Sequence, residues 1–223
     1  MRMRALLAVG VLASAGLGGW MLGQAAMGGA PSTAVVTFTL DFPGSDPPHY
    51  TIAIDAGGHG SYESTVPAEE DASEQTYRTE FEVSAVNRDR IFEWAKQAQY
   101  FAGKIDSGKR NLAFTGTKML SYQDGQRSFT ARYNYSALDP VRQLTALLQS
   151  VASTLDYGRR LTYYHHYQKL ALDDELKHME VQARNNELSE IQAVAPVLQE
   201  IIEDASVINV VRARAKELLA TGK

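Results

Sequence analysis

The sequence predicts an α+β fold: an antiparallel sheet of about six strands covered by two helices, followed by an all-helical C-terminal region. Three observations lead to this prediction. Apolar residues alternate with a period of two through most of residues 33–83 and 111–136, as in strands that bury one face. The period becomes that of a helix in residues 87–98 and 141–155. From Arg159 onward no strand pattern occurs, and Leu, Ala, Glu, Lys and Gln predominate.

Four strands are expected before the first helix. They cover residues 33–42, the stretch from Tyr50 to Gly57-Gly58, residues 60–66 and residues 76–83. In the first of them Val36, Phe38 and Leu40 fall on one side, which is typical of a strand with one buried face. The proline-rich stretch 43–48 and the glycine pair supply the turns between them.

A hairpin in residues 111–136 supplies the last two strands. Asp124-Gly125 is typical of a two-residue type I′ turn, in which glycine adopts positive φ. A turn of this kind places Leu120 opposite Phe129 and Lys118 opposite Ala131, with one face apolar and the other polar. Lys118 is then the only charge expected on the core face, where its ammonium would reach past the sheet edge.

Two helices are expected to cover the sheet. Asn87 is the expected N-cap of the first, and Asp139-Pro140 begins the second. The apolar positions of the second recur at helical spacing from Val141 to Leu155, and Gly158 is expected to end it as a C-cap residue.

Four further helical segments follow. Their expected bounds are Arg159–Leu172, Asp174–Asn185, Glu187–Glu203 and Ser206–Ala220. Pro196 lies inside the third and is expected to kink it, because proline lacks an N–H and clashes with the carbonyl four residues earlier.

These elements divide the chain into three expected parts: a signal peptide or N-terminal anchor in residues 1–30, an α+β domain in 33–158, and a helical tail in 159–223. Arg2 and Arg4 precede the apolar run Ala5–Leu22, and no acidic residue occurs before Asp41, as in secretory signals. The alternative is an uncleaved anchor, since about 17–25 apolar residues can span a bilayer. The expected location is extracytoplasmic, periplasmic or secreted, with membrane contact only through residues 5–22 if they are retained.

Composition excludes several classes of function. The formal net charge is −4, whereas nucleic-acid binders need a positive field, so nucleic acid is not an expected partner. The chain contains no cysteine, which excludes disulfides, thiolate nucleophiles, cysteine-ligated metal sites and a bacterial lipoprotein anchor.

The last two expected helices, with Pro196 and Ile201 on the first and Val211 and Leu218 on the second, resemble a single HEAT-type helical hairpin. Asp204 and Arg212 would correspond to the aspartate and arginine that brace such hairpins, at a spacing about two residues longer than usual. The layout from Val35 to Leu155 also resembles uncharacterised exported bacterial proteins, which implies a place in the cell and not an activity.

Glu175 and His178 are the best candidates for chemistry. Their spacing puts both side chains on one helix face, as in carboxylate-bridged di-iron bundles, and His165 is a further candidate ligand. Because such a bundle needs the motif twice and it occurs once, no cofactor is expected. The alternative is a metal-dependent enzyme or hydrolase that uses these tail histidines.

Two groups of residues are candidates for contact with a partner protein. Tyr163, Tyr164 and Tyr167 flank a histidine pair in the tail, and Glu69, Glu70 and Asp71 lie in the acidic stretch 67–75. Since no complete catalytic motif occurs, the sequence favours a non-catalytic protein-binding or assembly module of the cell envelope. A second alternative is an inhibitor of a secreted enzyme, with the acidic stretch as its contact.

Overall fold

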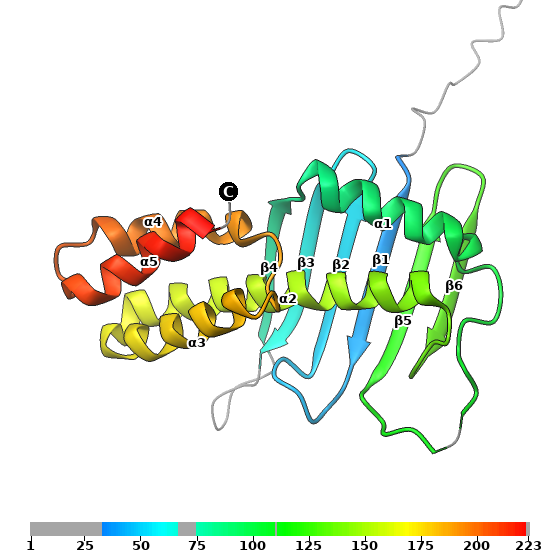
Figure 1. Ribbon diagram of the computed structural model, residues 1–223, viewed down its shortest axis with the longest axis horizontal. Helices are drawn as coiled ribbons and strands as arrows, with labels where there is room; N and C mark the ends of the chain where they lie inside the picture. The colour runs from blue at the N-terminus through cyan, green and yellow to red at the C-terminus, as the bar shows by residue number, and fades with distance from the viewer. Residues whose placement is uncertain (1–32, 67–74, 110, 222–223) are drawn as a thin grey trace, which may run out of the picture. The chain divides into compact units, whose positions relative to one another are not determined.

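Six strands form one antiparallel sheet (Figure 1). They are β1 Val35–Asp41, β2 His49–Asp55, β3 His59–Val66, β4 Gln75–Glu82, β5 Thr117–Gln123 and β6 Ser128–Tyr133. Their order across the sheet is β4-β3-β2-β1-β5-β6. The β5–β6 hairpin therefore pairs with the edge of β1 that is not occupied by β2. The α+β fold with an antiparallel sheet, predicted from the sequence, is confirmed.

The computed structural model describes residues 33–66, 75–109 and 111–221. These residues belong to one unit, Ser32–Lys223. The targeting segment expected in residues 1–30, and Glu69, Glu70 and Asp71 of the acidic stretch, lie outside the described residues. Among the described helices none is long and apolar enough to cross a membrane.

Alternation of apolar residues fixes how the central strands align. Phe38 of β1 pairs with Ile52 of β2 on one side and with Leu120 of β5 on the other, and all three are fully buried. A shift by one residue would turn these side chains to the open face of the sheet, so the buried row specifies the register.

The turn between β5 and β6 differs from the prediction. Leu120 pairs with Ala131, and Lys118 with Tyr133, so four residues and not two connect the strands. The Asp124 carboxylate accepts hydrogen bonds from the backbone N–H groups of Gln126 and Arg127, at 2.8 and 2.7 Å, which stabilises this longer turn. The predicted register was wrong by two residues, but because two is the period of a strand, the predicted faces are correct.

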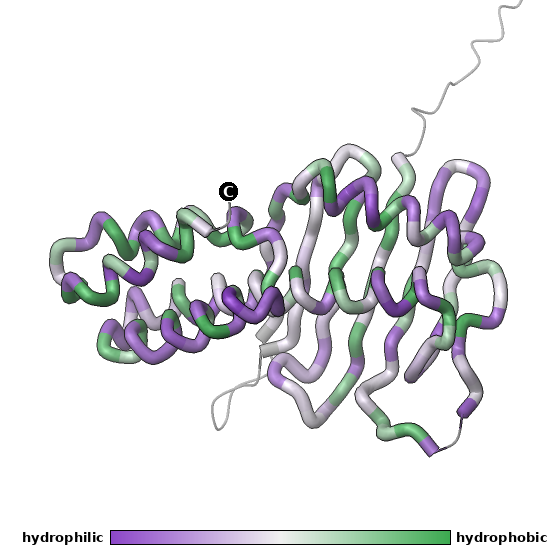
Figure 2. The backbone as a smooth tube through the Cα atoms, in the orientation of Figure 1, coloured by the Kyte–Doolittle hydropathy of each residue, from purple (hydrophilic) through white to green (hydrophobic). Residues whose placement is uncertain are grey.

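Two helices, α1 Ala85–Gln97 and α2 Asp139–Tyr167, cover one face of the sheet (Figure 1). Figure 2 shows apolar segments recurring between polar ones along α2 and the central strands. The N-cap of α1 is Ser84 and not Asn87, and the Ser84 hydroxyl accepts a hydrogen bond from the Asn87 backbone N–H. Pro140 stands in the first turn of α2, as predicted.

Helix α2 does not end at Gly158. It continues to Tyr167, and Gly158 is buried in its interior. A Cβ atom at this position would lie 2.5 Å from Cγ1 of Val194. The glycine therefore allows a close approach of another segment to α2, a tertiary requirement that the sequence pattern does not distinguish from a helix end.

Short helices form the C-terminal tail. They are the 3-10 turn η2 Lys169–Ala171, α3 Leu172–Arg184, the 3-10 turn η3 Ile191–Val194, α4 Ala195–Glu203 and α5 Asn209–Thr221. The predicted kink at Pro196 was wrong: α4 begins at Ala195, so the proline lies in its first turn, where no intrahelical N–H is needed. Helices α4 and α5 form a helical hairpin, but Arg212 Nε donates to the Ile202 carbonyl at 2.7 Å and not to Asp204.

The buried apolar residues form two clusters that meet within α2. The sheet core runs from Val36 to Leu155, and the tail core runs from Tyr157 to Leu218. The change between them falls close to the expected boundary at residues 158/159, although one continuous helix crosses it. The division into separate domains stays a prediction.

Candidate functional site

The C-terminal end of α2 carries exposed aromatic residues. Tyr163 is 41% and Tyr167 is 76% exposed, and their ring centroids lie 5.2 Å apart. Leu170, in the turn that follows, is 93% exposed, whereas Tyr164 is partly buried against the tail core. We call Tyr163, Tyr167 and Leu170 the tail tip. Two of the three tyrosines predicted as contacts are thus available to a partner.

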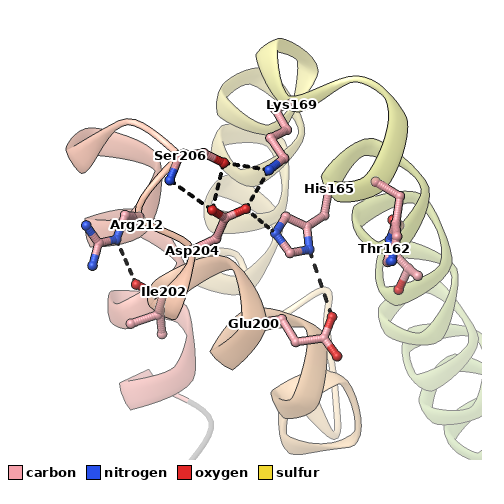
Figure 3. A network of polar contacts seen from close by, with 9 residues as sticks. Thr162, His165, Lys169, Glu200, Ile202, Asp204, Ser206 and Arg212 are labelled. Carbon is pink, nitrogen blue, oxygen red and sulfur yellow. Dashed lines mark hydrogen bonds and ion pairs between the residues drawn. The ribbon is translucent and has the colours of Figure 1, made fainter.

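A polar network lies beside the tail tip and converges on Asp204, as Figure 3 shows. The Asp204 carboxylate accepts from Lys169 Nζ at 2.6 Å and lies 2.9 Å from Nε2 of His165. Its other oxygen accepts from the Ser206 backbone N–H at 2.8 Å, and Lys169 also donates to the Ser206 hydroxyl at 2.6 Å. The Lys169 ammonium, then Ser206, hold the pKa of Asp204 well below its usual range, so the carboxylate stays charged.

The network braces two turns against each other. His165 and Lys169 come from the end of α2 and the turn after it, and Asp204 and Ser206 come from the connection between α4 and α5. The Ser206 hydroxyl contacts a carboxylate and an ammonium group but no imidazole, so the arrangement is not a serine–histidine pair for nucleophilic catalysis.

Glu175 and His178 lie elsewhere, on α3, where both line an open cleft of about 360 Å³. The other polar residues of its lining are Tyr157 and Arg160 of α2, Gln182 of α3 and Asp46 of the β1–β2 connection. The Glu175 carboxylate accepts from Arg160 Nε at 2.6 Å and is only slightly exposed. The sequence correctly placed Glu175 and His178 on one helix face, but the structure does not bring His165 to them.

A buried ion-pair cluster shares Arg160 and Glu175 with the lining of this cleft. The Asp156 side chain is 5% exposed and accepts from Arg159 Nε at 2.8 Å and from Arg160. The Arg160 guanidinium lies over the Tyr157 ring, 4.5 Å from its centroid. Burial, followed by the charge of Glu175, raises the pKa of Tyr157 to about 12, so its hydroxyl stays protonated at neutral pH.

Sequence reasoning missed Asp156 and Arg160 of this cluster, and Asp46 of the cleft lining. The spacing of four residues between Asp156 and Arg160 on one helix is a signal that could have found their pair. No sequence signal connects either of them with Asp46, because only folding brings the β1–β2 connection to α2.

No group of three or more histidine, aspartate or glutamate side chains with the geometry to hold a metal ion occurs in residues 33–66, 75–109 and 111–221. The candidate ligands Glu175 and His165 instead contact Arg160 and Asp204 respectively.

Lys118 is buried on the core face of β5, as the sequence predicts. Its ammonium donates to the Thr115 carbonyl at 3.0 Å, to the Thr115 hydroxyl at 2.8 Å and to the Asn134 carbonyl at 3.2 Å. Burial lowers its pKa. The Lys118 ammonium thus joins Thr115, before β5, to Asn134, after β6, which is a structural role.

No protein-family model matches the chain, and no curated protein matches it.

Proposed function

We propose that this protein is a non-catalytic binding or assembly module of the cell envelope, and that the tail tip is its contact with a partner protein. The observation that carries the proposal is the exposure of Tyr167 and Leu170, at 76% and 93%, on a turn held by the Asp204 network. The location in the cell envelope rests on Arg2, Arg4 and the apolar run that follows them.

Pre-organisation is the physical reason for assigning a contact here. Exposing the apolar surface of tyrosine and leucine side chains to water is unfavourable in free energy. Such side chains therefore gain binding free energy when they enter a pocket of a partner protein. A turn that is already fixed by ion pairs loses little further conformational entropy on binding. The bonds of Asp204 to Lys169, His165 and Ser206 supply this rigidity beside the tip.

The charge of the surroundings favours a protein partner over an anionic membrane surface. Peripheral membrane binding uses clusters of free basic residues. Lys169, which precedes Leu170 of the tip in the sequence, is already paired with Asp204. We therefore expect a partner with an uncharged apolar recess that accepts the Tyr167 ring and the Leu170 side chain.

Site-specific cross-linking in the native host tests the proposal. Tyr167 is replaced by a photoreactive benzoyl-phenylalanine in the full-length chain, with the same replacement at exposed Lys216 of α5 as the matched control. We expect one discrete protein adduct from position 167 and none from position 216. The same partner should no longer co-purify with the Tyr167→Ser/Leu170→Ser variant.

Three results would contradict the proposal. They are the absence of any adduct from position 167, an adduct formed equally from position 216, and unchanged co-purification with the double variant. Recovery of all the protein from the cytosol would contradict the envelope location separately.

A further inference from the structure

Strand β6 forms one end of the sheet, and its outer edge pairs with no other strand in the described part of the chain. The Asp124 N–H donates to the Arg127 carbonyl at 2.9 Å, and this bond fixes which backbone groups of β6 face β5. Every second residue of an antiparallel strand turns its N–H and C=O to its partner. The backbone groups that point away from the sheet are therefore those of Ser128, Thr130 and Arg132.

The next residue of this outward series is already paired. The Asn134 N–H donates to the Asp106 carboxylate at 2.9 Å, and the Ser107 N–H donates to the Tyr135 carbonyl, also at 2.9 Å. The connection before β5 thus covers the chain just after β6. The outward backbone groups of β6 itself bond to no further segment among the described residues.

The opposite edge of the sheet, β4, is protected in a way that β6 is not. The Val83 N–H donates to the Gly58 carbonyl at 2.9 Å, which fixes the same alternation there. The outward backbone groups of β4 include those of Arg78, Glu80 and Glu82. Exposed charged side chains at an edge oppose the addition of another strand. Arg132 is the single charged residue of β6, so β6 is the edge that accepts a further strand more readily.

The side chains of β6 define what kind of strand fits beside it. Those of Ser128, Thr130 and Arg132 are exposed on the open face of the sheet, whereas those of Phe129 and Ala131 are half-buried on the face that the helices cover. The side chains of an added strand alternate between the same two faces. The positions on the covered face therefore favour apolar residues, and those on the open face favour polar ones.

Charge narrows the choice of polar residues. Arg132, and Lys104 and Lys109 of the connection before β5, are exposed and take part in no ion pair among the described residues. Hydrogen bonds from backbone N–H groups, first that of Asn134, hold the pKa of Asp106 below its usual range, so this carboxylate stays ionised. The other charges beside β6 form two ion pairs that cancel, Arg127 with Asp124 and Arg142 with Asp139. Three cations against one carboxylate leave a positive excess, in a chain whose net charge is −4, which favours an acidic partner.

We infer that the outer edge of β6 binds an extended acidic segment of a partner protein, which joins the sheet as a further antiparallel strand with a carboxylate opposite Arg132. Backbone hydrogen bonds to Ser128, Thr130 and Arg132 supply affinity, and the alternating side chains supply specificity. This contact goes beyond the proposed function and shares no residue with the tail tip, so the failure of either one leaves the other standing.

NMR on the full-length protein tests this inference. The acidic probe is the peptide acetyl-Glu-Val-Glu-Val-Thr-amide, whose first glutamate lies opposite Arg132 in an antiparallel addition. Its matched control carries lysine in place of both glutamates. We expect the acidic probe to shift the backbone amide signals of Ser128, Thr130 and Arg132 and to slow their hydrogen exchange, whereas the lysine probe should bind about tenfold more weakly.

Two methylated probes distinguish strand addition from simple attraction of charges. N-methylation of the central glutamate removes an N–H that faces β6 and should weaken binding about five- to tenfold, the equivalent of one hydrogen bond. N-methylation of the valine before it changes an N–H that faces solvent, so binding should change little.

Two pairs of protein variants locate the peptide. Arg132→Glu should reverse the preference between the acidic and the lysine probe, whereas Lys216→Glu on α5, also exposed, should not. Thr130→Pro should abolish binding, whereas Glu80→Pro on β4 should not. Both prolines replace an N–H that faces away from the sheet, where edge strands accept proline, so both variants should fold. The charge variants and the methylated probes decide the question even if a proline variant does not fold.

Several results would overturn the inference. They are unchanged amide signals along β6, equal binding of the acidic and lysine probes, equal weakening by the two N-methyl groups, and amide shifts confined to β4 or to the tail tip. Slowed exchange of the outward amides of β6 that depends on protein concentration and not on the probe would also overturn it, because this edge would then bind a second copy of the chain.

Discussion

The sheet core and the tail core are held by different interactions. In the sheet, each strand is aligned with its neighbours by backbone hydrogen bonds, and the buried row of Phe38, Ile52 and Leu120 fixes the register. The tail helices have no such ladder between them. Side-chain ion pairs connect them instead, as Arg160 joins α2 to Glu175 of α3, and Arg214 joins α5 to Asp173 of α3.

This difference follows from how strands and helices satisfy the hydrogen-bonding groups of their backbones. A strand must pair with a neighbouring strand, whereas a helix satisfies its backbone internally and can rotate or slide against its neighbours. Charged side chains at fixed positions limit this freedom, which suggests that the tail depends on electrostatics more than the sheet does. The predictions below test this contrast.

The largest effect is expected from Asp156→Asn in the tail cluster. The Asp156 side chain is 5% exposed, and its carboxylate pairs with Arg159 and Arg160. The variant removes this carboxylate, and breaking a buried ion pair lowers the free energy of unfolding by about 3–5 kcal/mol. We expect the lower end of this range, because Arg160 keeps Glu175. Urea denaturation measures the loss.

The matched control in the sheet is Glu63→Gln. Glu63 pairs with Arg78 across β3 and β4, but the two side chains are 48% and 74% exposed, so a change within about 1 kcal/mol is expected. Equal losses in the two variants would remove the distinction between the tail and the sheet.

The second prediction concerns the close approach at Gly158. Replacing a glycine inside a helix by alanine normally stabilises it by roughly 0.5–1 kcal/mol. Here the new Cβ would lie 2.5 Å from Val194 Cγ1, and overpacking costs about 1–3 kcal/mol, so Gly158→Ala should destabilise the protein by about 1–2 kcal/mol. Thermal unfolding measures it.

Val194→Ala in the Gly158→Ala background supplies the control, since it removes the methyl group that the new Cβ meets. The double variant should lose less stability than the two single variants lose when their losses are added together. If the two losses of stability were strictly additive, the close contact with Val194 would not explain why position 158 is a glycine.

The third prediction is a loss of sheet stability at alkaline pH. Burial raises the pKa of Tyr62 from 10.0 to about 12, and it also raises the pKa values of Tyr50 and Tyr133. Each group contributes stability that is complete below pH 10 and is lost as pH rises through the pKa of the folded state. For Tyr62 the loss reaches about 1.4 kcal/mol at pH 11.

Denaturation of Tyr62→Phe between pH 9 and 12 measures this contribution. Its stability should fall less steeply with pH than that of the wild type, whereas exposed Tyr167→Phe should follow the wild type. A slope unchanged by Tyr62→Phe would contradict the burial of this hydroxyl.

The fourth prediction places the acid sensitivity in the tail. Lys169 and Ser206 lower the pKa of Asp204 from 3.8, so its contribution to stability is present above about pH 4 and is lost as pH falls through the lower pKa of the folded state. Asp204→Asn should be less stable at pH 7 and should lose less stability than the wild type between pH 4 and 2.

Exposed Asp41→Asn, at the end of β1, is the control for the acid series and should change neither property. Circular dichroism during acid titration in a fixed urea concentration compares the three proteins. A wild-type slope in Asp204→Asn would show that the network in Figure 3 does not stabilise the fold.

The smallest effect is expected at the turn between β5 and β6. Positive φ occurs at Gly58, Gly108 and Gly116 among the described glycines, and not at Gly125, so Gly125→Val should introduce no backbone strain. Asp124→Ala removes the acceptor for two backbone N–H groups and should be the more destabilising change in urea. A larger loss of stability in Gly125→Val than in Asp124→Ala would instead support the two-residue turn that the sequence predicts.

Much of the fold was predictable because it depends on local pattern. Alternation at Val36, Phe38 and Leu40 placed β1, and the apolar spacing after Pro140 placed α2 against the sheet. Two of the errors concern residue types that occur in more than one local setting. The sequence pattern predicts a helix end at Gly158 and a kink at Pro196, although Gly158 lies inside α2 and Pro196 lies in the first turn of α4.

The candidate sites were less predictable. The tyrosines of the tail tip and the common helix face of Glu175 and His178 follow from spacing along one helix. The partners of these residues do not, because Asp46 and Arg160 reach the cleft from different parts of the chain.

The sequence by itself therefore determined the elements, their buried faces and the absence of cysteine chemistry, since these depend on residue type and on periods of two and 3.6. Only the tertiary structure decided which side chains meet. Glu190 bonds the Ser84 N–H and hydroxyl and the Asn87 amide across more than 100 residues, at 3.0, 2.7 and 2.7 Å, and so completes the cap of α1. Contacts of this range leave no periodic signal, because they arise from the packing of whole elements and not from neighbours along the chain.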